Sequence, residues 1–333
     1  MNTKRIPVLL AAALLAGCGG GASPTARDRA NSRAAPDTVA ATSRATTARE
    51  ATTAGATPAA AARRAKPPPP FPRLLPSALA SQPTHFVPVA TWHGQTAAWI
   101  ARTPAGIGLL AFNQNLLALR LHSGTTDAGS VGWRYGPSIA GLEARHLVAA
   151  FNGGFRFSYG AGGFMSYGRV AVPLRAGLAS IVTYANGTTD IGAWDEGVPA
   201  RGQQVASVRQ NLSLLVDHGQ IASTVDCVSC WGSTLGGVVD PARSGVGVTA
   251  HGRLIWVGGE HLTVSALAAA LLGAGAVRAV ELDINPAWVA GYVYGHRGGK
   301  GPLAPIPVVP GQVGVSGQYL VPWSRDFFTV VAR

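Results

Sequence analysis

Charged residues are scarce in this sequence. Only 13% of its 333 residues are Asp, Glu, Lys or Arg, against 43 glycines and 23 prolines. So little charge is unlike a salt-bridged coiled coil, and the glycines follow no three-residue period, which excludes a collagen triple helix. The 47% of apolar residues is enough to build a core. The composition therefore excludes disorder of the whole chain and favours a turn-rich globular fold.

The common short motifs of enzymes are also missing. The chain has no G-x-S-x-G nucleophile elbow, no H-E-x-x-H zinc motif and no G-x-x-x-x-G-K-[ST] phosphate loop. The glycines at 273 and 275 follow an expected helix and precede an expected strand, which reverses the order of a dinucleotide-binding fingerprint. We therefore expect no cofactor and no metal held by the protein, while assistance by a divalent ion stays open.

The excess of positive charge lies mainly near the N-terminus. Residues 1–80 hold 11 of the 27 Lys and Arg residues but 3 of the 15 acidic ones, a net charge of +8, and residues 81–333 carry only +4. No cluster of basic residues in 81–333 has the density that binding to a phosphate backbone needs. The sequence therefore predicts no nucleic-acid partner.

The first eighteen residues have the pattern of a bacterial lipoprotein signal. Lys4 and Arg5 precede an apolar stretch over 6–16, which is shorter than the ~20 residues of a membrane-spanning helix. The following LAGC at 15–18 resembles a lipobox, in which Cys18 is acylated, and several acyl chains would anchor the chain to a membrane. We expect a lipid-anchored, extracytoplasmic protein, with an ordinary cleaved signal peptide as the alternative.

Residues 19–80 differ in composition from the rest of the chain. They are mainly Ala, Thr, Arg, Pro and Gly, with four consecutive prolines at 67–70. Such a segment buries too little apolar surface to offset the entropy of ordering it, which predicts a disordered tether. Aromatic and β-branched residues become frequent from about Ser81, so one folded domain is expected over 81–333.

Two β-hairpins are expected in this domain. Asn186 and Gly187 separate apolar runs at 178–184 and 188–194, and an Asn-Gly pair in this position is the strongest short hairpin signal. The runs at 245–249 and 254–257 flank a second turn.

One helix is clear in the sequence. It begins near Thr263 or Ser265 as the N-cap and ends at Gly273, and a strand follows over 277–284. Strands thus outnumber helices. We predict an α+β domain with a mixed, twisted β-sheet and few helices.

Two carboxylates occupy one face of the last of these strands. Glu281, Asp283 and Asn285 alternate with apolar residues, so their Cα atoms are spaced by roughly 6.6 Å. A pair of carboxylates at this spacing can serve glycoside hydrolysis. The alternative is a solvated polar face, although the preceding Ala/Leu helix indicates a buried neighbourhood, in which paired carboxylates are costly.

Three further positions are candidates for binding. Asn152, Gly153 and Gly154 follow an apolar run, where glycines permit close approach of a ligand to the backbone. Arg243, before an apolar strand, and Arg209 each carry a planar guanidinium able to bind phosphate in a bidentate way. A tight turn and two salt-bridged arginines are the structural alternatives.

Cys227 and Cys230 would remain once Cys18 is acylated. In an oxidising compartment such a pair most often closes a disulfide. A redox-active C-x-x-C would open a helix after a strand, which Trp231 and Gly232 do not favour, and zinc would need two further ligands. The sequence predicts a local structural disulfide.

Taken in order, these segments resemble the phosphodiester glycosidase family over about residues 147–333. The resemblance rests on AAFNGGF at 149–155, RQNL at 209–212, ARSGVG at 242–247 and AVELD at 279–283. The family usually continues the last motif as LDGGG, whereas this chain reads LDINPAW. Together with the WSRDFF tail, this resembles a divergent, actinobacterial-type member.

The resemblance implies hydrolysis of a glycosyl phosphodiester, or of another envelope glycan, outside the cytoplasm. Asp283 or Glu281 would act at the anomeric carbon, Arg243 would bind the phosphate, and Asn152 with the glycines at 153 and 154 would orient ligand oxygens. These residues should then meet at one pocket.

Two other functions stay open at this stage. One is a non-catalytic glycan-binding lipoprotein that uses the same cleft with its chemistry lost, which the altered sequence after Asp283 favours. The other is a surface protein that contacts other envelope proteins through tryptophans such as Trp92, Trp99, Trp288 and Trp323.

Overall fold

The computed structural model describes residues 71–333, apart from 82, 235–236 and 297–300. The expected signal over 1–18, with Cys18, and the tether as far as residue 70 lie outside the described residues. Within the described part, the fold begins before Ser81. Strand β1 (Arg73–Leu74) pairs with β2 (Val87–Trp92), and α1 (Pro76–Ala80) contributes the buried Ala78 to the core. Residues 71–80 are therefore part of the domain rather than of the tether.

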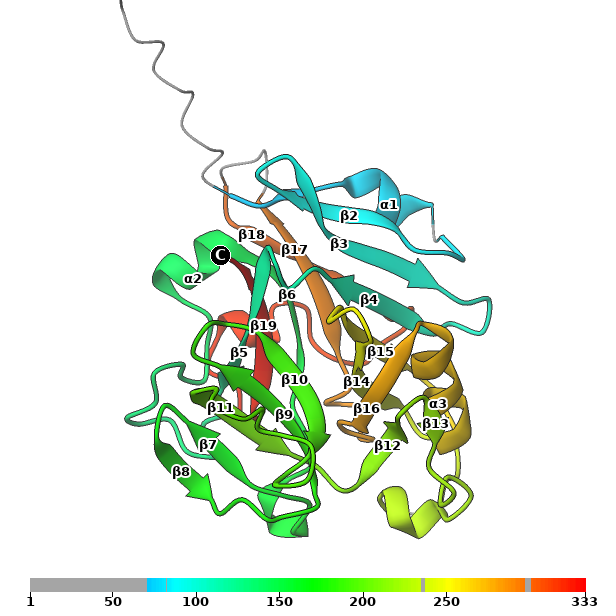
Figure 1. Ribbon diagram of the computed structural model, residues 1–333. Coiled ribbons are helices and arrows are strands. Elements are labelled where there is room, and N and C mark those ends of the chain that lie inside the picture. The colour runs from blue at the N-terminus through cyan, green and yellow to red at the C-terminus, as the bar shows by residue number, and fades with distance from the viewer. Residues whose placement is uncertain (1–70, 82, 235–236, 297–300) are drawn as a thin grey trace, which may run out of the picture. The chain divides into compact units, whose positions relative to one another are not determined.

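The largest of three β-sheets has nine strands in the order β1-β2-β3-β4-β15-β14-β16-β12-β13 (Figure 1). Its remaining members are β3 (Gln95–Arg102), β4 (Gly108–Phe112), β12 (Leu214–Asp217), β13 (Gln220–Ile221), β14 (Arg243–Thr249), β15 (Leu254–Gly259) and β16 (Ala276–Glu281).

The two other sheets have five strands each. One has the order β10-β9-β11-β7-β8, and the other has the order β18-β17-β6-β19-β5. Their bounds are β5 (Leu117–His122), β6 (Leu147–Asn152), β7 (Phe164–Ser166), β8 (Arg169–Val172), β9 (Ala179–Tyr184), β10 (Thr189–Ala193), β11 (Val205–Gln210), β17 (Gly291–His296), β18 (Leu303–Pro307) and β19 (Phe327–Ala332).

The predicted fold class, α+β with few helices, is confirmed. The described residues contain three α-helices, α1, α2 (Gly141–His146) and α3 (Val264–Gly273), and short 3-10 turns that include η1 (Phe157–Tyr159), η2 (Val228–Trp231) and η4 (Gln318–Leu320). The strands differ from the expected mixed sheet, because every ladder within the three sheets is antiparallel. Short hairpins join many neighbouring strands, and such turns give antiparallel pairs, whereas parallel pairs need long crossovers.

The local predictions of hairpins and helix hold. Strands β9 and β10 pair with Thr183 opposite Thr189, and Gly187 takes the positive φ of 82° that the turn requires. Strands β14 and β15 form the second hairpin. Thr263 caps α3, since its side-chain oxygen accepts a hydrogen bond from the backbone N–H of Ala266 at 3.1 Å.

Strand ends from two sheets meet where polar residues cluster. In the nine-stranded sheet, Arg243 begins β14 and Glu281 ends β16, its neighbour. Asn152 ends β6 of the third sheet, and its side-chain nitrogen donates to the hydroxyl of Ser244 at 2.9 Å. Helix α3 packs on β14, β15 and β16 (Figure 1). Its Leu267 and Leu271 are buried in the core there. The fold thus brings chain segments far apart in sequence to one junction.

Candidate active site

A cavity of about 860 Å³ lies beside the end of β16, next to this junction. Among the predicted site residues, Asp283 and Asn285 reach its wall. The wall is made by Phe155, Tyr159, Ala161, Leu212, Ser229, Gly232, Ser233, Thr234, Val238, Asp240, Pro241, Ala242, Glu260, His261, Asp283, Ile284, Asn285, Pro286 and Trp288. The cavity is large enough for a small-molecule ligand, and its mixture of apolar and acidic groups is typical of ligand sites.

Asp283 is fixed at the cavity wall by its own loop. One carboxylate oxygen, Oδ1, accepts hydrogen bonds from the backbone N–H groups of Ile284 at 2.7 Å and Asn285 at 2.9 Å. The other oxygen, Oδ2, lies 3.4 Å from a guanidinium nitrogen of Arg325. Burial raises the pKa of Asp283 to about 7, against the opposing effect of Arg325 and of the two backbone hydrogen bonds. Asp283 is therefore a cavity carboxylate that changes protonation near neutral pH.

Glu281 lies in a sealed layer beneath the cavity rather than on its wall. Its Oε1 is 2.6 Å from Nη1 of Arg243, and both side chains are fully buried. Arg243 also donates from Nε to the carbonyl of Leu262 at 2.9 Å and from Nη1 to the carbonyl of Trp231 at 3.1 Å. Burial raises the pKa of Glu281 to about 7 although Arg243 opposes it. The pair holds the ends of two neighbouring strands together.

The Asn152 side chain joins two sheets. Its nitrogen donates to the Ser244 hydroxyl, and its oxygen accepts from the backbone N–H of Ala290 at 3.3 Å. Ser244 is paired in turn with the chain around Asp283, because its N–H donates to the Asp283 carbonyl at 3.1 Å. Asn152 therefore connects β6 to the strand ends that carry the carboxylates.

The two glycines after Asn152 allow close approach, and protein side chains make that approach in this structure. A side chain at Gly153 would overlap the carboxylate of Asp326, and a Cβ at Gly154 would lie 2.9 Å from Oδ1 of Asn211. Arg209 pairs with Asp326 at 2.7 Å, and both are fully buried. Arg209 also donates to the carbonyl of Phe155 at 2.5 Å. These contacts hold residues 153–155 in place, and Phe155 is the residue of this segment that lines the cavity.

The predicted residues lie near one another, but of this set Asp283 and Asn285 alone line the cavity. Hydrogen bonds connect Asn152 to Ser244 and Ser244 to Asp283. Arg243, the residue before Ser244 in the chain, forms an ion pair with Glu281. Asn285 reaches the cavity, but its side-chain oxygen accepts from the N–H of Ala287 at 2.9 Å and so shapes the loop.

Sequence reasoning did not single out several buried polar residues of this network, among them Asn211 and Arg325. Asn211 donates to the carbonyls of Glu281 at 2.6 Å and Leu282 at 2.9 Å. Arg325 contacts Asp283, forms an ion pair with Asp127 and donates to the carbonyl of Gly154 at 2.8 Å. The signal was available for Arg325 and Asp326, because two opposite charges stand directly before β19, a strand buried at every position.

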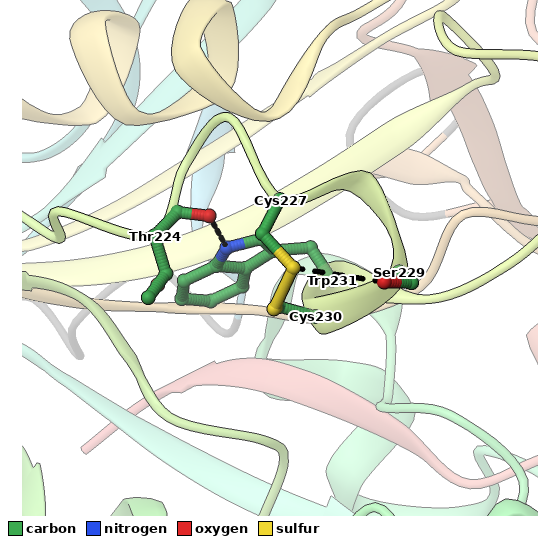
Figure 2. Close-up of a disulfide and its surroundings, with 5 residues drawn as sticks. All are labelled: Thr224, Cys227, Ser229, Cys230 and Trp231. Carbon is green, nitrogen blue, oxygen red and sulfur yellow. Dashed lines mark hydrogen bonds between the residues drawn. A yellow bond between two sulfur atoms is a disulfide. The ribbon is translucent and has the colours of Figure 1, made fainter.

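The predicted disulfide between Cys227 and Cys230 is confirmed, with Cα atoms 5.4 Å apart (Figure 2). The next residue, Trp231, is buried, and its indole N–H donates to the carbonyl of Thr224 at 2.8 Å. Because the Trp231 carbonyl accepts from Arg243, the disulfide-bonded turn is linked directly to the buried ion pair.

Other sequence expectations concern metals, tryptophans and membranes. In the part of the chain that the structure describes, no three His, Cys, Asp or Glu side chains are grouped to hold a metal ion. Of the four tryptophans named above, Trp92 is buried and donates to the Arg333 carbonyl at 3.0 Å, Trp99 and Trp323 are partly buried against the core, and Trp288 lines the cavity. No helix over the described residues has the length and apolar character needed to cross a bilayer.

Comparison with known proteins finds only distant structural similarity. No family model matches the chain, and no curated protein matches its sequence. The catalytic domain of zebrafish N-acetylglucosamine-1-phosphodiester alpha-N-acetylglucosaminidase, auto-inhibited by its pro-peptide, is similar at a TM-score of 0.44 and 15% identity, over 71% of this chain and 78% of that one. A hypothetical protein from Synechocystis gives 0.40 and 14%, over 71% and 62%. A protein of Burkholderia pseudomallei named as an exported protein gives 0.33 and 14%, over 68% and 73%.

Proposed function

We propose that this protein is a hydrolase that cleaves the bond between the anomeric carbon of a sugar and a phosphodiester. The observation that carries this proposal is Asp283, a buried carboxylate on the wall of a ligand-sized cavity, with its pKa raised to about 7. Strongly perturbed carboxylates in clefts are typical of catalytic sites. The sequence motifs that surround this site are those that resemble phosphodiester glycosidases.

The proposed reaction needs little general-acid catalysis. Water adds its oxygen to the anomeric carbon and loses one proton to the solvent, the bond from that carbon to the phosphate oxygen breaks, and the phosphate leaves as a monoester with the electron pair. The phosphate is already a weak base, so the main need is a negative charge next to the oxocarbenium-like centre. The ionised Asp283 would supply it, while its Oδ1 stays fixed by two backbone N–H groups.

In this proposal the buried polar residues do not contact the ligand, and they hold in place the chain segments that surround Asp283. Arg243 and Glu281 are sealed from the cavity, so in this proposal they hold the end of β16 and with it the approach to Asp283. Arg209 and Asn152, with the adjacent glycines, would hold the opposite segment in the same way. Any direct contact of Arg243 with a phosphate would require the Trp231 segment to move first.

The test is hydrolysis in ¹⁸O-labelled water. The full chain, purified in detergent, is incubated with alkyl phosphodiesters of α- and β-linked N-acetylglucosamine, and the products are analysed by mass spectrometry. The proposal predicts that the label enters the sugar, because the bond at carbon breaks. Label in the phosphate would indicate a phosphodiesterase instead. Ligand-dependent thermal stabilisation with no product release would indicate a non-catalytic glycan-binding protein.

We further propose that the protein acts outside the cytoplasm, anchored to the bacterial membrane through lipid on Cys18. The lipoprotein-like signal supports this location, and a disulfide at Cys227 and Cys230 fits an oxidising compartment. Metabolic labelling of cells with an alkyne fatty acid tests the anchor. The wild-type chain should carry the label, and a Cys18→Ala variant should carry none.

A further inference from the structure

Two arginines contact one indole ring on the cavity wall. Trp288 lines the cavity, and the guanidinium carbons of Arg156 and Arg325 each lie 4.5 Å from the centroid of its ring. Both distances are well within the range of cation–π contacts. Two guanidinium groups from outside the lining therefore flank one aromatic ring of the cavity wall.

The charges of these two arginines are compensated very differently. Arg325 is buried and faces the carboxylates of Asp127 and Asp283. Arg156 is exposed, and within the described residues its guanidinium forms neither an ion pair nor a hydrogen bond. Arg156 therefore carries the charge that is free to meet a ligand.

The backbone that presents Arg156 and Trp288 is held in place. Phe155, immediately before Arg156, donates its N–H to Asn211 at 3.1 Å and accepts from Arg209 at 2.5 Å through its carbonyl. On the other segment, the N–H of Trp288 donates to the carbonyl of Asn285 at 2.8 Å. Both side chains thus extend from anchored loops, which lowers the entropy lost when a ligand binds.

We propose that Arg156 and Trp288 form a phosphate-binding subsite beside the cavity that receives the sugar. A guanidinium stacked on an aromatic face keeps its N–H edge free, and that edge matches two oxygens of a phosphate. The sugar phosphodiester as ligand rests on the proposed function. The preference for a phosphate-bearing ligand over a neutral one follows from the uncompensated charge of Arg156.

Calorimetric titration of the full chain tests the subsite without relying on turnover. The probes are N-acetylglucosamine 1-phosphate, inorganic phosphate and neutral N-acetylglucosamine. Arg156→Ala should weaken the two phosphate probes roughly 10- to 100-fold, the range for a hydrogen bond to a charged group, and leave the neutral sugar unchanged. Raising the salt from about 0.05 to about 0.5 M should weaken phosphate binding to the wild type more than to this variant.

Arg169→Ala is the matched control, because Arg169 is an exposed arginine 4.4 Å above a different indole, that of Trp133, away from the cavity wall. It should bind all probes as the wild type does. The inference is overturned if the wild type binds neither phosphate probe, if Arg156→Ala binds them normally, or if Arg169→Ala loses as much. Phosphate binding through Arg156 without any hydrolysis would leave the subsite standing and reject the proposed enzyme activity.

Discussion

The carboxylate of Asp326 lies 2.7 Å from Nε of Arg209 and occupies the space in which a side chain at residue 153 would stand. An ion pair that is fully buried is costly to displace, since each charge would lose its partner in a low-dielectric environment. Gly153 is therefore required here by the packing of the protein itself.

Gly153→Ala should destabilise the domain strongly. Overpacking a rigid core costs roughly 1–3 kcal/mol, and we expect the upper end because the added methyl group meets a buried carboxylate. Urea unfolding followed by fluorescence measures the change. Gly136→Ala is the control, because a Cβ at Gly136 has no neighbour within 4 Å. Equal stability of the two variants would contradict the packing.

The Arg243–Glu281 pair predicts strong coupling between two substitutions. Glu281→Leu alone leaves the buried charge of Arg243 unpaired, and Arg243→Met alone leaves the buried Glu281 carboxyl without its partner; each should cost roughly 3–5 kcal/mol. The double variant should be more stable than the sum of the two losses predicts, because it leaves no unpaired charge. A thermodynamic cycle of urea unfolding experiments gives the coupling energy. Additive losses would show that the two side chains do not interact.

The raised pKa of Asp283 also predicts how stability depends on pH. Its folded-state pKa of about 7 exceeds the ordinary value of 3.8 for an aspartate, so between these values the folded state holds more protons than the unfolded state. The free energy of unfolding should therefore fall as the pH rises from about 4 to about 7, by up to ~1.4 kcal/mol per pH unit from this group. Glu281, with its pKa also raised to about 7, acts in the same direction.

Asp283→Asn should flatten this pH dependence, since Asn keeps an oxygen for the N–H groups of Ile284 and Asn285 but does not titrate. Urea unfolding at a series of pH values measures the slope. Asp240→Asn, at the half-exposed rim of the same cavity, should keep the wild-type slope. A steeper slope in Asp283→Asn than in the wild type would be incompatible with the raised pKa.

Catalytic activity should depend on pH in the opposite direction to the free energy of unfolding. If the ionised Asp283 stabilises the transition state, kcat/KM should rise as the pH passes through about 7 and then level off. Asp283→Asn should lower kcat by roughly 10²–10³-fold, the effect of removing one electrostatic stabiliser, and should abolish the rise. A profile that falls through pH 7 would instead indicate that Asp283 donates a proton as a general acid.

Local signals in the sequence were sufficient for much of the fold. The Asn186-Gly187 turn forms through the positive φ of Gly187 and a hydrogen bond from the Thr188 N–H to Asn186 Oδ1, and Thr263 caps α3 through a bond to a residue three positions away. The alternation at 280–285 predicted one continuous strand face for Glu281, Asp283 and Asn285. It did not indicate that β16 ends at Glu281 and that Asp283 lies in a hydrogen-bonded turn.

The position of Asp283 on the cavity wall, with Glu281 behind it, could not be predicted in this way. Glu281 is covered because Arg243 lies opposite it and is itself bonded to Leu262 and Trp231. Asp283 reaches the wall next to Arg325, which comes from a segment 42 residues later. Strand register and packing between sheets determine which arginine lies next to each carboxylate. Neither of them produces a periodic pattern in the sequence near that carboxylate.

Removal of the disulfide should lower the free energy of unfolding and loosen the buried segment that contacts the Arg243–Glu281 ion pair. A bridge that closes a loop of only about four residues contributes roughly 2 kcal/mol in the chain-entropy description. The double variant Cys227→Ser/Cys230→Ser should lose about that much free energy of unfolding. Because Trp231 follows the bridge and its carbonyl accepts from Arg243, the loss should depend on that partner. In an Arg243→Met/Glu281→Leu background, opening the bridge should therefore cost measurably less. An unchanged cost in that background would show that the turn and the ion pair are energetically independent.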